Sequence, residues 1–281
     1  MKLKKNKNTK PSLYGLHAVR EAWLNEDRTV HALYITPQAS RNFEKTALEG
    51  TNLGIRRPKP TVIEKQKLDK MLPKGAVHQG IALSCSPLEE MDERDLAIRL
   101  HLKKNSVVAI LDQVTDPHNV GAIIRSASAF GLDGLILQKK HAPELDGVLA
   151  KTACGALDHV HIAKATNLSR AIEEFQAIGY LVVGLDERGE QTIDNLAQAT
   201  RNVSPKKKTV SKPLDVATSS KIGKHDKFLL VLGSEGSGIR HNVKEKCDVL
   251  VKLPTHGAIA SLNVSNAAAV AFYVLSEPDE T

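Results

Sequence analysis

The chain has 281 residues, of which 41% are hydrophobic and 25% are charged, a composition typical of a folded protein rather than a disordered one. This length is enough for one large domain or two modest ones, each with its own core. No apolar run approaches the roughly 18 residues of a membrane helix, and no apolar segment follows the charged N-terminus as in a secretion signal. A membrane protein is therefore excluded, and we expect a soluble, cytoplasmic protein.

The positive charge is concentrated at the N-terminus. The net charge is +7, from 39 basic and 32 acidic residues. Without the five lysines of residues 1–11, 34 basic residues face 32 acidic ones, which is nearly neutral. We therefore predict a basic tail over residues 1–11 that either tethers the protein to a nucleic-acid backbone or is simply solvated. The five lysines are Lys2, Lys4, Lys5, Lys7 and Lys10.

The cysteines argue against covalent or metal cross-links. Cys85, Cys154 and Cys247 are odd in number, widely spaced and never part of a CxxC pair. Neither a disulfide framework nor a zinc site fits this pattern. We expect reduced thiols in an intracellular protein, with no bound metal.

Predicted helices and strands alternate over residues 12–87, which indicates a small α/β domain. Residues 88–104 are polar and charged, with a partly helical pattern, and are predicted to link this domain to the next. In residues 12–87 the helices are expected after Gly15, over Phe43–Leu48 and before Pro73, and the strands over Val30–Pro37 and Val77–Cys85.

The same alternation runs through residues 105–281 and predicts a second α/β domain. Val107–Val114 is an apolar run with one acidic break, which is typical of a strand buried on both faces of a parallel sheet. Residues 201–227 are polar and rich in lysine, and are predicted to be a flexible insertion. The other expected elements are strands over Gly134–Leu137, His159–Ala163 and Tyr180–Leu185, and helices over Leu145–Thr152 and Leu168–Ile178.

The strand Val107–Val114 opens into the loop and helix TDPHNVGAIIRSASAFG. We expect Asn119 to cap a helix that starts near Val120, with Arg125 projecting back toward the loop. Ligands of open α/β sheets bind at the carboxyl ends of strands, so Asn119 and Arg125 are candidate ligand contacts. A helix cap and a surface arginine would also explain both residues.

A second loop follows the apolar strand in FLLVLGSEGSGIR. Gly233, Gly236 and Gly238 surround Glu235, and a glycine-rich loop lets backbone approach a ligand closely. The spacing differs from the G-x-G-x-x-G of dinucleotide sites, and a central acid disfavours phosphate. An adenosine or a cationic ligand fits this loop better.

The third stretch, LPTHGAIASLNVSNAAAVAFY, is predicted to be a strand ending at Pro254, a loop containing Gly257 and a helix over Val264–Val274. Small and branched apolar residues surround this helix, so we expect it to be buried on most sides. More polar groups crowd its start than one cap requires. These are Ser261, Asn263, Ser265 and Asn266, and a well-capped core helix is the simpler alternative.

Together, DPHNVGAIIRSASAFG, LLVLGSEGSGIR and LPTHGAIASLNVSNAA resemble the motifs of the SpoU (TrmH-like) branch of the SPOUT RNA ribose methyltransferases. Residues 12–87, with YGLHAV and HQGIAL, resemble the small ribosomal-protein-L30e-like domain with which RlmB-type members bind their RNA substrate. The resemblance implies an α/β fold whose C-terminal parallel sheet is threaded into a trefoil knot. It also implies a homodimer that binds S-adenosylmethionine without a metal.

By this resemblance, five residues are expected to bind the cofactor through main-chain groups and apolar walls: Leu232, Gly233, Leu253, Gly257 and Leu262. The same comparison assigns the catalytic set to Asn119, Arg125, Glu235, Ser261 and Asn263.

The implied chemistry is attack of a ribose 2′-hydroxyl on the sulfonium methyl group. Family mechanisms make Arg125 the base, but a guanidinium almost never deprotonates. We expect Arg125 instead to bind the target phosphate and polarise the hydroxyl. Asn119 would orient Arg125 or the ribose, and Glu235 would hold a neighbouring polar group. Ser261 and Asn263 would shape the nucleoside pocket.

The expected activity is 2′-O-methylation of a ribose, most closely a guanosine, in 23S ribosomal RNA. A tRNA substrate is the first alternative, although the L30e-like domain argues against it. A catalytically silent RNA-binding protein of the same fold is the second, and the intact motif residues argue against that. A nicotinamide-dependent dehydrogenase is a weaker alternative still, because the required glycine spacing and ribose-binding acid are not in place.

Overall fold

The computed structural model describes residues 10–201, 225–258 and 261–276. The chain forms two compact units. The first contains Met1–Glu89 together with Val120–Arg125 and Pro143–His159, and the second contains the remainder. The expected basic tail, except Lys10, and most of the expected insertion lie outside the described residues.

The first unit is built on a mixed four-stranded sheet in the order β1-β4-β2-β3, in which only β2 and β3 are parallel. Three helices accompany it, and the later segment of this unit adds α6 (Gly147–Thr152) and the 3₁₀ helix η1 (Ala156–Asp158). The remaining elements are β1 (Leu13–Tyr14), α1 (Leu16–Leu24), β2 (Val30–Ile35), α2 (Pro37–Asn52), β3 (Thr61–Val62), α3 (Lys65–Met71) and β4 (Ile81–Cys85).

Two boundaries in this unit differ from the sequence prediction. The helix expected over Phe43–Leu48 is the centre of α2, which starts at Pro37 because the Thr36 hydroxyl accepts a hydrogen bond from the Ala39 amide. The strand expected from Val77 begins only at Ile81. A turn with positive φ at Gln79 and Gly80 precedes it.

The predicted linker contains a helix that belongs to the core of the second unit. Helix α4 (Glu93–Leu100) starts with a capping box in which the side chains of Asp92 and Asp95 each accept a bond from the other's backbone amide. Its residues Leu96 and Leu100 are almost fully buried in that core. The sequence prediction missed this apolar face because residues 88–104 are mostly polar.

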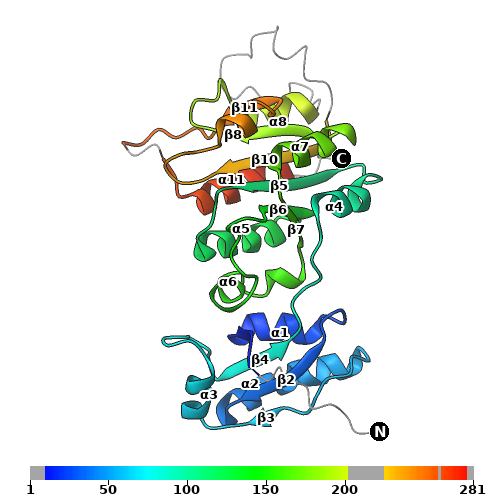
Figure 1. Ribbon diagram of the computed structural model, residues 1–281, viewed down its shortest axis with the longest axis vertical. Helices are drawn as coiled ribbons and strands as arrows, with labels where there is room; N and C mark the ends of the chain where they lie inside the picture. Colours follow the sequence, from blue (N-terminus) through cyan, green and yellow to red (C-terminus); the bar gives the residue numbers. More distant parts are fainter. Residues whose placement is uncertain (1–9, 202–224, 259–260, 277–281) are drawn as a thin grey trace. The chain divides into compact units, whose positions relative to one another are not determined.

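The second unit is a seven-stranded sheet in the order β7-β6-β5-β10-β8-β11-β9, with every neighbouring pair parallel (Figure 1). All seven residues of β5 are buried, as expected for a central strand covered on both faces. Its strands are β5 (Ser106–Asp112), β6 (Gly134–Gln138), β7 (His161–Ala165), β8 (Leu181–Leu185), β9 (Gln191–Thr192), β10 (Lys227–Gly233) and β11 (Val249–Lys252).

Helices cover both faces of this sheet. Apolar side chains of α4 and α7 (Leu168–Ala177) share one core with residues of β5, β6, β8 and β10. Helix α11 (Val264–Ser276) runs beside β10 and β5 and also contacts α8 (Ile193–Arg201) (Figure 1). Helix α11 is buried on most sides, as expected, and its exposed residues Asn266, Val270 and Tyr273 lie on one stripe, where Val270 is 45% and Tyr273 is 54% exposed.

The strand order reverses at β5. The chain first moves outward from β5 to β6 and β7, then returns to the other side, where β10 lies between β5 and β8. Such a reversal opens a crevice at the carboxyl ends of the strands. The three motif loops follow β5, β10 and β11 at this edge. The parallel sheet matches the expected fold class, and the trefoil knot stays a prediction.

Among the described residues, no helix is long and apolar enough to cross a membrane. The same residues include no cluster of three or more His, Cys, Asp or Glu side chains placed to hold a metal ion.

Candidate active site

The first loop positions Asn119 differently from the sequence prediction. Helix α5 (Pro117–Ala129) starts three residues earlier than expected, and Asp116 is its cap, accepting a 3.0 Å bond from the Asn119 amide. Pro117 fits the first helical position because its missing N–H would have no partner there. Asn119 therefore lies in the first turn, and its side-chain amide is not used as the cap.

The second loop is tight because of its glycines. A Cβ on Gly233 would lie 2.1 Å from the backbone carbon of Gly238, so any side chain there would break the turn. Gly236 and Gly238 have φ values of 89° and 66°, a region that glycine adopts without strain. The turn carries Glu235 at its exposed tip.

The third loop ends in Asn263, whose carbonyl side-chain oxygen caps α11. It accepts bonds from the Ser265 amide at 2.9 Å and from the Ser265 hydroxyl at 2.5 Å. Because the oxygen is used by the cap, only the Nδ2 group of Asn263 remains free to donate hydrogen bonds to other loops. Its Nδ2 group points to the other two loops.

A hydrogen-bonded cluster of Asn119, Glu235 and Asn263 joins the three loops. Glu235 Oε1 accepts from Asn263 Nδ2 at 2.6 Å and from Asn119 Nδ2 at 3.2 Å. Asn263 Nδ2 also donates to Asn119 Oδ1 at 3.0 Å. Bonds to a carboxylate are stronger than neutral ones, so a single charge holds residues that are 144 positions apart in the chain. We call this group the loop cluster.

Arg125 is not joined to the loop cluster. It lies on α5 six residues after Asn119, about 9 Å further along the helix axis. Its side chain is exposed, and no hydrogen bond or ion pair connects it to another described residue. A guanidinium in this state is available to an anionic ligand.

The other expected site residues differ in exposure. Leu232 is buried at the end of β10, whereas Leu262 is 42% exposed. Gly257 and Ser261 are also exposed, and the described structure contains no hydrogen bond from the Ser261 side chain. Leu253 is half-buried and follows the end of β11, which stops at Lys252 rather than at Pro254.

Sequence reasoning missed the pair Asp112 and Arg240, which anchors the second loop to β5. The Asp112 carboxylate is completely buried and accepts from Arg240 Nε at 2.7 Å and from the Arg240 amide at 2.9 Å. A buried carboxylate needs such partners. The signal was the single acid in an otherwise apolar strand.

A second ion pair lies beyond β8. Asp186 follows the end of this strand and pairs with Lys244 of α10 (His241–Lys244). Burial alone would raise the pKa of Asp186, but hydrogen bonds from Lys244 and from the Arg188 amide outweigh it and lower the pKa below its usual value. The carboxylate therefore stays charged at neutral pH.

An all-parallel, doubly wound sheet with a polar site at its switch point defines a ligand-binding α/β domain, and its glycine loop is not of the dinucleotide type. The sequence model of the SpoU rRNA Methylase family matches residues 106–273, and that of the RNA 2′-O ribose methyltransferase substrate binding domain matches residues 12–91. The chain belongs to the SpoU rRNA Methylase family. The expected family is thereby confirmed.

Individual relatives cover nearly the whole chain. The 23S rRNA (guanosine-2′-O-)-methyltransferase RlmB of Haemophilus ducreyi is 32% identical over 93% of this chain and 95% of its own length. The putative TrmH family tRNA/rRNA methyltransferase YacO of Bacillus subtilis is 32% identical over 92% of each chain.

Solved structures share the fold. The SpoU methyltransferase AviRb of Streptomyces viridochromogenes superimposes with a TM-score of 0.68 at 21% identity, over 94% of this chain and 87% of that one. A second AviRb structure, in complex with the cofactor AdoMet, has a TM-score of 0.66 at 22% identity, over 94% and 88% of the two chains. At these identities the likeness shows the common fold.

Proposed function

We propose that the protein uses S-adenosylmethionine to methylate the 2′-hydroxyl of a guanosine ribose in 23S ribosomal RNA. The observation that carries the proposal is the loop cluster, which draws the three motif loops together at the switch point of the sheet. The RlmB relatives, which match over nearly the full chain, support the substrate. We also propose that the enzyme acts in the cytoplasm, because its proposed substrate is ribosomal RNA.

The residues at this edge fit S-adenosylmethionine. The tight turn at Gly233 brings backbone groups to the surface, and the exposed Leu262 offers an apolar wall for an adenine ring. In our proposal Leu232, Leu253 and Gly257 complete this pocket. The bound cofactor supplies a methyl group activated by its sulfonium charge.

Arg125 is the group that we propose prepares the RNA. A ribose hydroxyl is a weak nucleophile that must be oriented and must lose its proton. The permanently charged guanidinium of Arg125 binds the adjacent phosphate and polarises the hydroxyl, and a phosphate oxygen takes the proton. Asn119 orients the ribose, while Ser261 and Asn263 border the nucleoside.

The proposal is tested by methyl transfer from radiolabelled S-adenosylmethionine to unmodified 23S rRNA and, in parallel, to unmodified tRNA. We expect label in the 23S rRNA alone, at one ribose. Transfer to tRNA would favour the alternative that the name of the Bacillus subtilis relative includes. Absence of label in both RNAs and in ribosomal precursor particles, without cofactor binding, would favour a silent RNA-binding protein.

We further propose that the active form is a homodimer. The supporting observation is the apolar face of α11, where Val270 and Tyr273 are exposed although the helix is otherwise made of core-type residues. Tyr273 packs edge-on against Phe130 of the same chain at 6.0 Å, which extends the apolar surface. Sedimentation equilibrium should give twice the chain mass, and Val270→Glu should give the monomer. A monomeric wild type would refute this assembly.

A further inference from the structure

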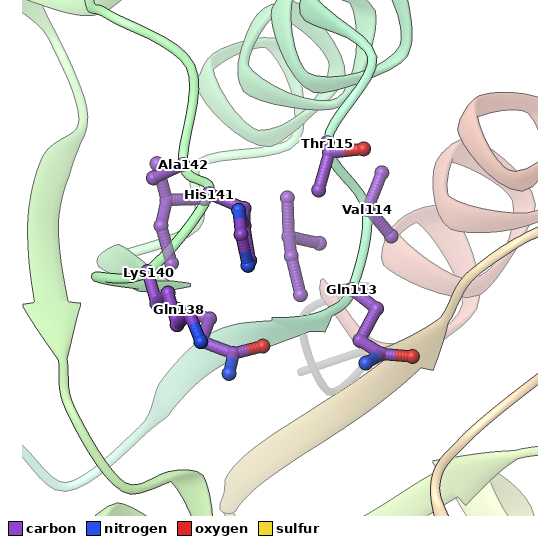
Figure 2. A pocket seen from close by; sticks show the side chains of 9 residues that line it. Gln113, Val114, Thr115, Gln138, Lys140, His141 and Ala142 are labelled. Atoms are coloured by element: carbon purple, nitrogen blue, oxygen red, sulfur yellow. The ribbon is translucent and has the colours of Figure 1, made fainter.

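A cavity of about 220 Å³ lies between the carboxyl ends of β5 and β6, on the side of β5 away from β10 (Figure 2). Its floor is apolar, with the buried side chains of Leu111 and Leu137. Its rim is polar and carries two amides, an imidazole and an ammonium group. These belong to Gln113, Gln138, His141 and Lys140.

The rim side chains form no bonds with other described protein groups. Figure 2 shows the His141 ring among the lining side chains, on the side of the cavity opposite Val114 and Thr115. Within the described chain, the four rim side chains have no hydrogen-bond or ion-pair partner. Gln113, Lys140 and His141 are exposed, so their polar groups face water and are available to a ligand that enters the cavity.

The backbone holds two of these residues in an unusual conformation. Gln113 and His141 have φ values of 60° and 70°, in the left-handed region that residues other than glycine rarely adopt. Each residue follows a strand at the edge where ligands bind. The rest of the fold must stabilise these conformations, and such strain is concentrated at binding sites.

The chemistry of the cavity fits a single nucleobase. An apolar floor and an imidazole suit the face of a flat aromatic ring, and glutamine amides pair with the hydrogen-bonding edge of a base. Lys140 suits the attached phosphate. The volume is below the roughly 300–1,000 Å³ of sites for drug-sized ligands and suits a single base better than a whole cofactor.

We infer that this cavity binds one unstacked base of the RNA substrate, an inference that rests on the proposed function. Neighbouring strands are about 4.8 Å apart, and β6 and β10 flank β5 on opposite sides, so the cavity between β5 and β6 lies one to two strand spacings, about 5–10 Å, from β10, whose loop carries Glu235. An RNA strand whose ribose reaches the cluster therefore passes the mouth of the cavity. Enzymes that modify nucleotides hold displaced bases in such pockets.

Photocrosslinking tests this inference directly. The full-length protein is irradiated with 23S rRNA that carries 6-thioguanosine or 4-thiouridine, and the crosslinked peptides are identified by mass spectrometry. We expect crosslinks in the peptides that contain Gln113 or residues 138–142. Crosslinks confined to other regions would overturn the inference, whether or not methyl transfer occurs.

Kinetics provide a second test with a matched control. His141→Ala should raise the KM for 23S rRNA about tenfold or more, because a stacked base contributes that much to affinity. Lys140→Ala should also raise it, because the variant loses the charge that binds the attached phosphate. Lys139→Ala should leave it unchanged, since this neighbouring exposed lysine does not line the cavity. Unchanged binding of S-adenosylmethionine in all three variants shows that they are folded.

Filling the cavity separates its role from that of the loop cluster. Ala142→Phe should raise the KM for RNA by a similar factor without weakening cofactor binding. If wild type methylates 23S rRNA but the Lys140, His141 and Ala142 variants keep its KM, the inference fails and the proposed function stands. If wild type methylates no RNA, the proposed function fails and the crosslinks alone decide the role of the cavity.

Discussion

Two polar networks among the described residues have opposite character. The loop cluster is exposed, and its carboxylate binds two side-chain amides on neighbouring loops. In the first unit, the side chains of Arg28 and Asp158 are only 3% and 2% exposed and form a bidentate ion pair. Asn25 donates a third bond to the same carboxylate at 2.8 Å.

The difference in burial indicates that the Arg28–Asp158 network is structural and that the loop cluster is suited to binding ligands. A buried charge must keep its partner, because water cannot replace it. The protein loses little stability when an exposed carboxylate changes its hydrogen bonds. Such a carboxylate can therefore exchange its partners for a substrate. The buried network therefore determines folding, and the exposed one is free to serve binding and chemistry.

The largest expected effect concerns Arg125. We predict that Arg125→Ala lowers methyl transfer at least about a thousandfold, because no other described group is proposed to bind the phosphate and polarise the hydroxyl. Binding of S-adenosylmethionine, measured by calorimetry, should persist. Arg94→Ala, which removes an exposed arginine outside both matched family regions, is the control and should retain full activity. Near-normal turnover of the Arg125 variant would refute its assignment.

Breaking the buried pair should have the next largest effect. Asp158→Ala leaves the Arg28 guanidinium buried without its counter-charge, so the free energy of unfolding should fall by about 3–5 kcal/mol. Denaturant titration measures this loss. Asp27→Ala, at an exposed acid of the same unit, should change stability by less than about 0.5 kcal/mol.

The double variant Arg28→Met with Asp158→Leu sharpens the same test. Removing both charges should cost less than removing Asp158 alone, since no unpaired charge remains buried. A double variant less stable than Asp158→Ala would contradict this electrostatic explanation.

Glu235→Gln should separate activity from stability in the loop cluster. The amide keeps one acceptor oxygen but loses the charge that strengthens the bonds from Asn119 and Asn263. We expect methyl transfer to fall about tenfold to a hundredfold, with the unfolding free energy changed by less than about 0.5 kcal/mol. Equal losses in both quantities would show that this cluster is structural, like the buried pair.

The smallest effect is expected at Asp186, which is intermediate in burial. Because its folded pKa is lowered, its stabilisation is fully present above the ordinary Asp pKa and is lost as the pH falls through the folded value. Asp186→Asn should therefore destabilise the protein by about 1 kcal/mol at pH 7. The difference from wild type should disappear at the acidic end of a pH series of denaturant titrations. A difference that is constant with pH would contradict the ion pair.

The local sequence pattern was sufficient to predict many of the strands, helices and loops. The apolar runs predicted the strands at Val107 and Phe228, and glycine positions marked the loop that carries Glu235. These features depend on neighbouring residues alone, because side-chain alternation and turn geometry act over a few positions. The three motifs together also identified the family that the comparisons establish.

Cap assignment and burial were less predictable. Asp116 and Asn119 can both cap a helix, and the geometry of Pro117 decides for Asp116. The polar linker conceals the core-facing residues of α4, and α11, although mostly buried as expected, exposes one stripe that its composition did not predict. In each case burial depends on what packs against the helix, which a single segment does not encode.

The sequence by itself determined the alternating elements, the three loop motifs and the residue types available for chemistry. Only the tertiary structure decided that β10 lies between β5 and β8 and that Asn119, Glu235 and Asn263 meet. It also revealed the anchor from Asp112 to Arg240 and the cavity beside β6. The physical reason is that these features depend on strand order, which no local preference specifies. The bonds from Asp112 to Arg240 and from Asn119 to Asn263, for example, join residues more than 100 positions apart.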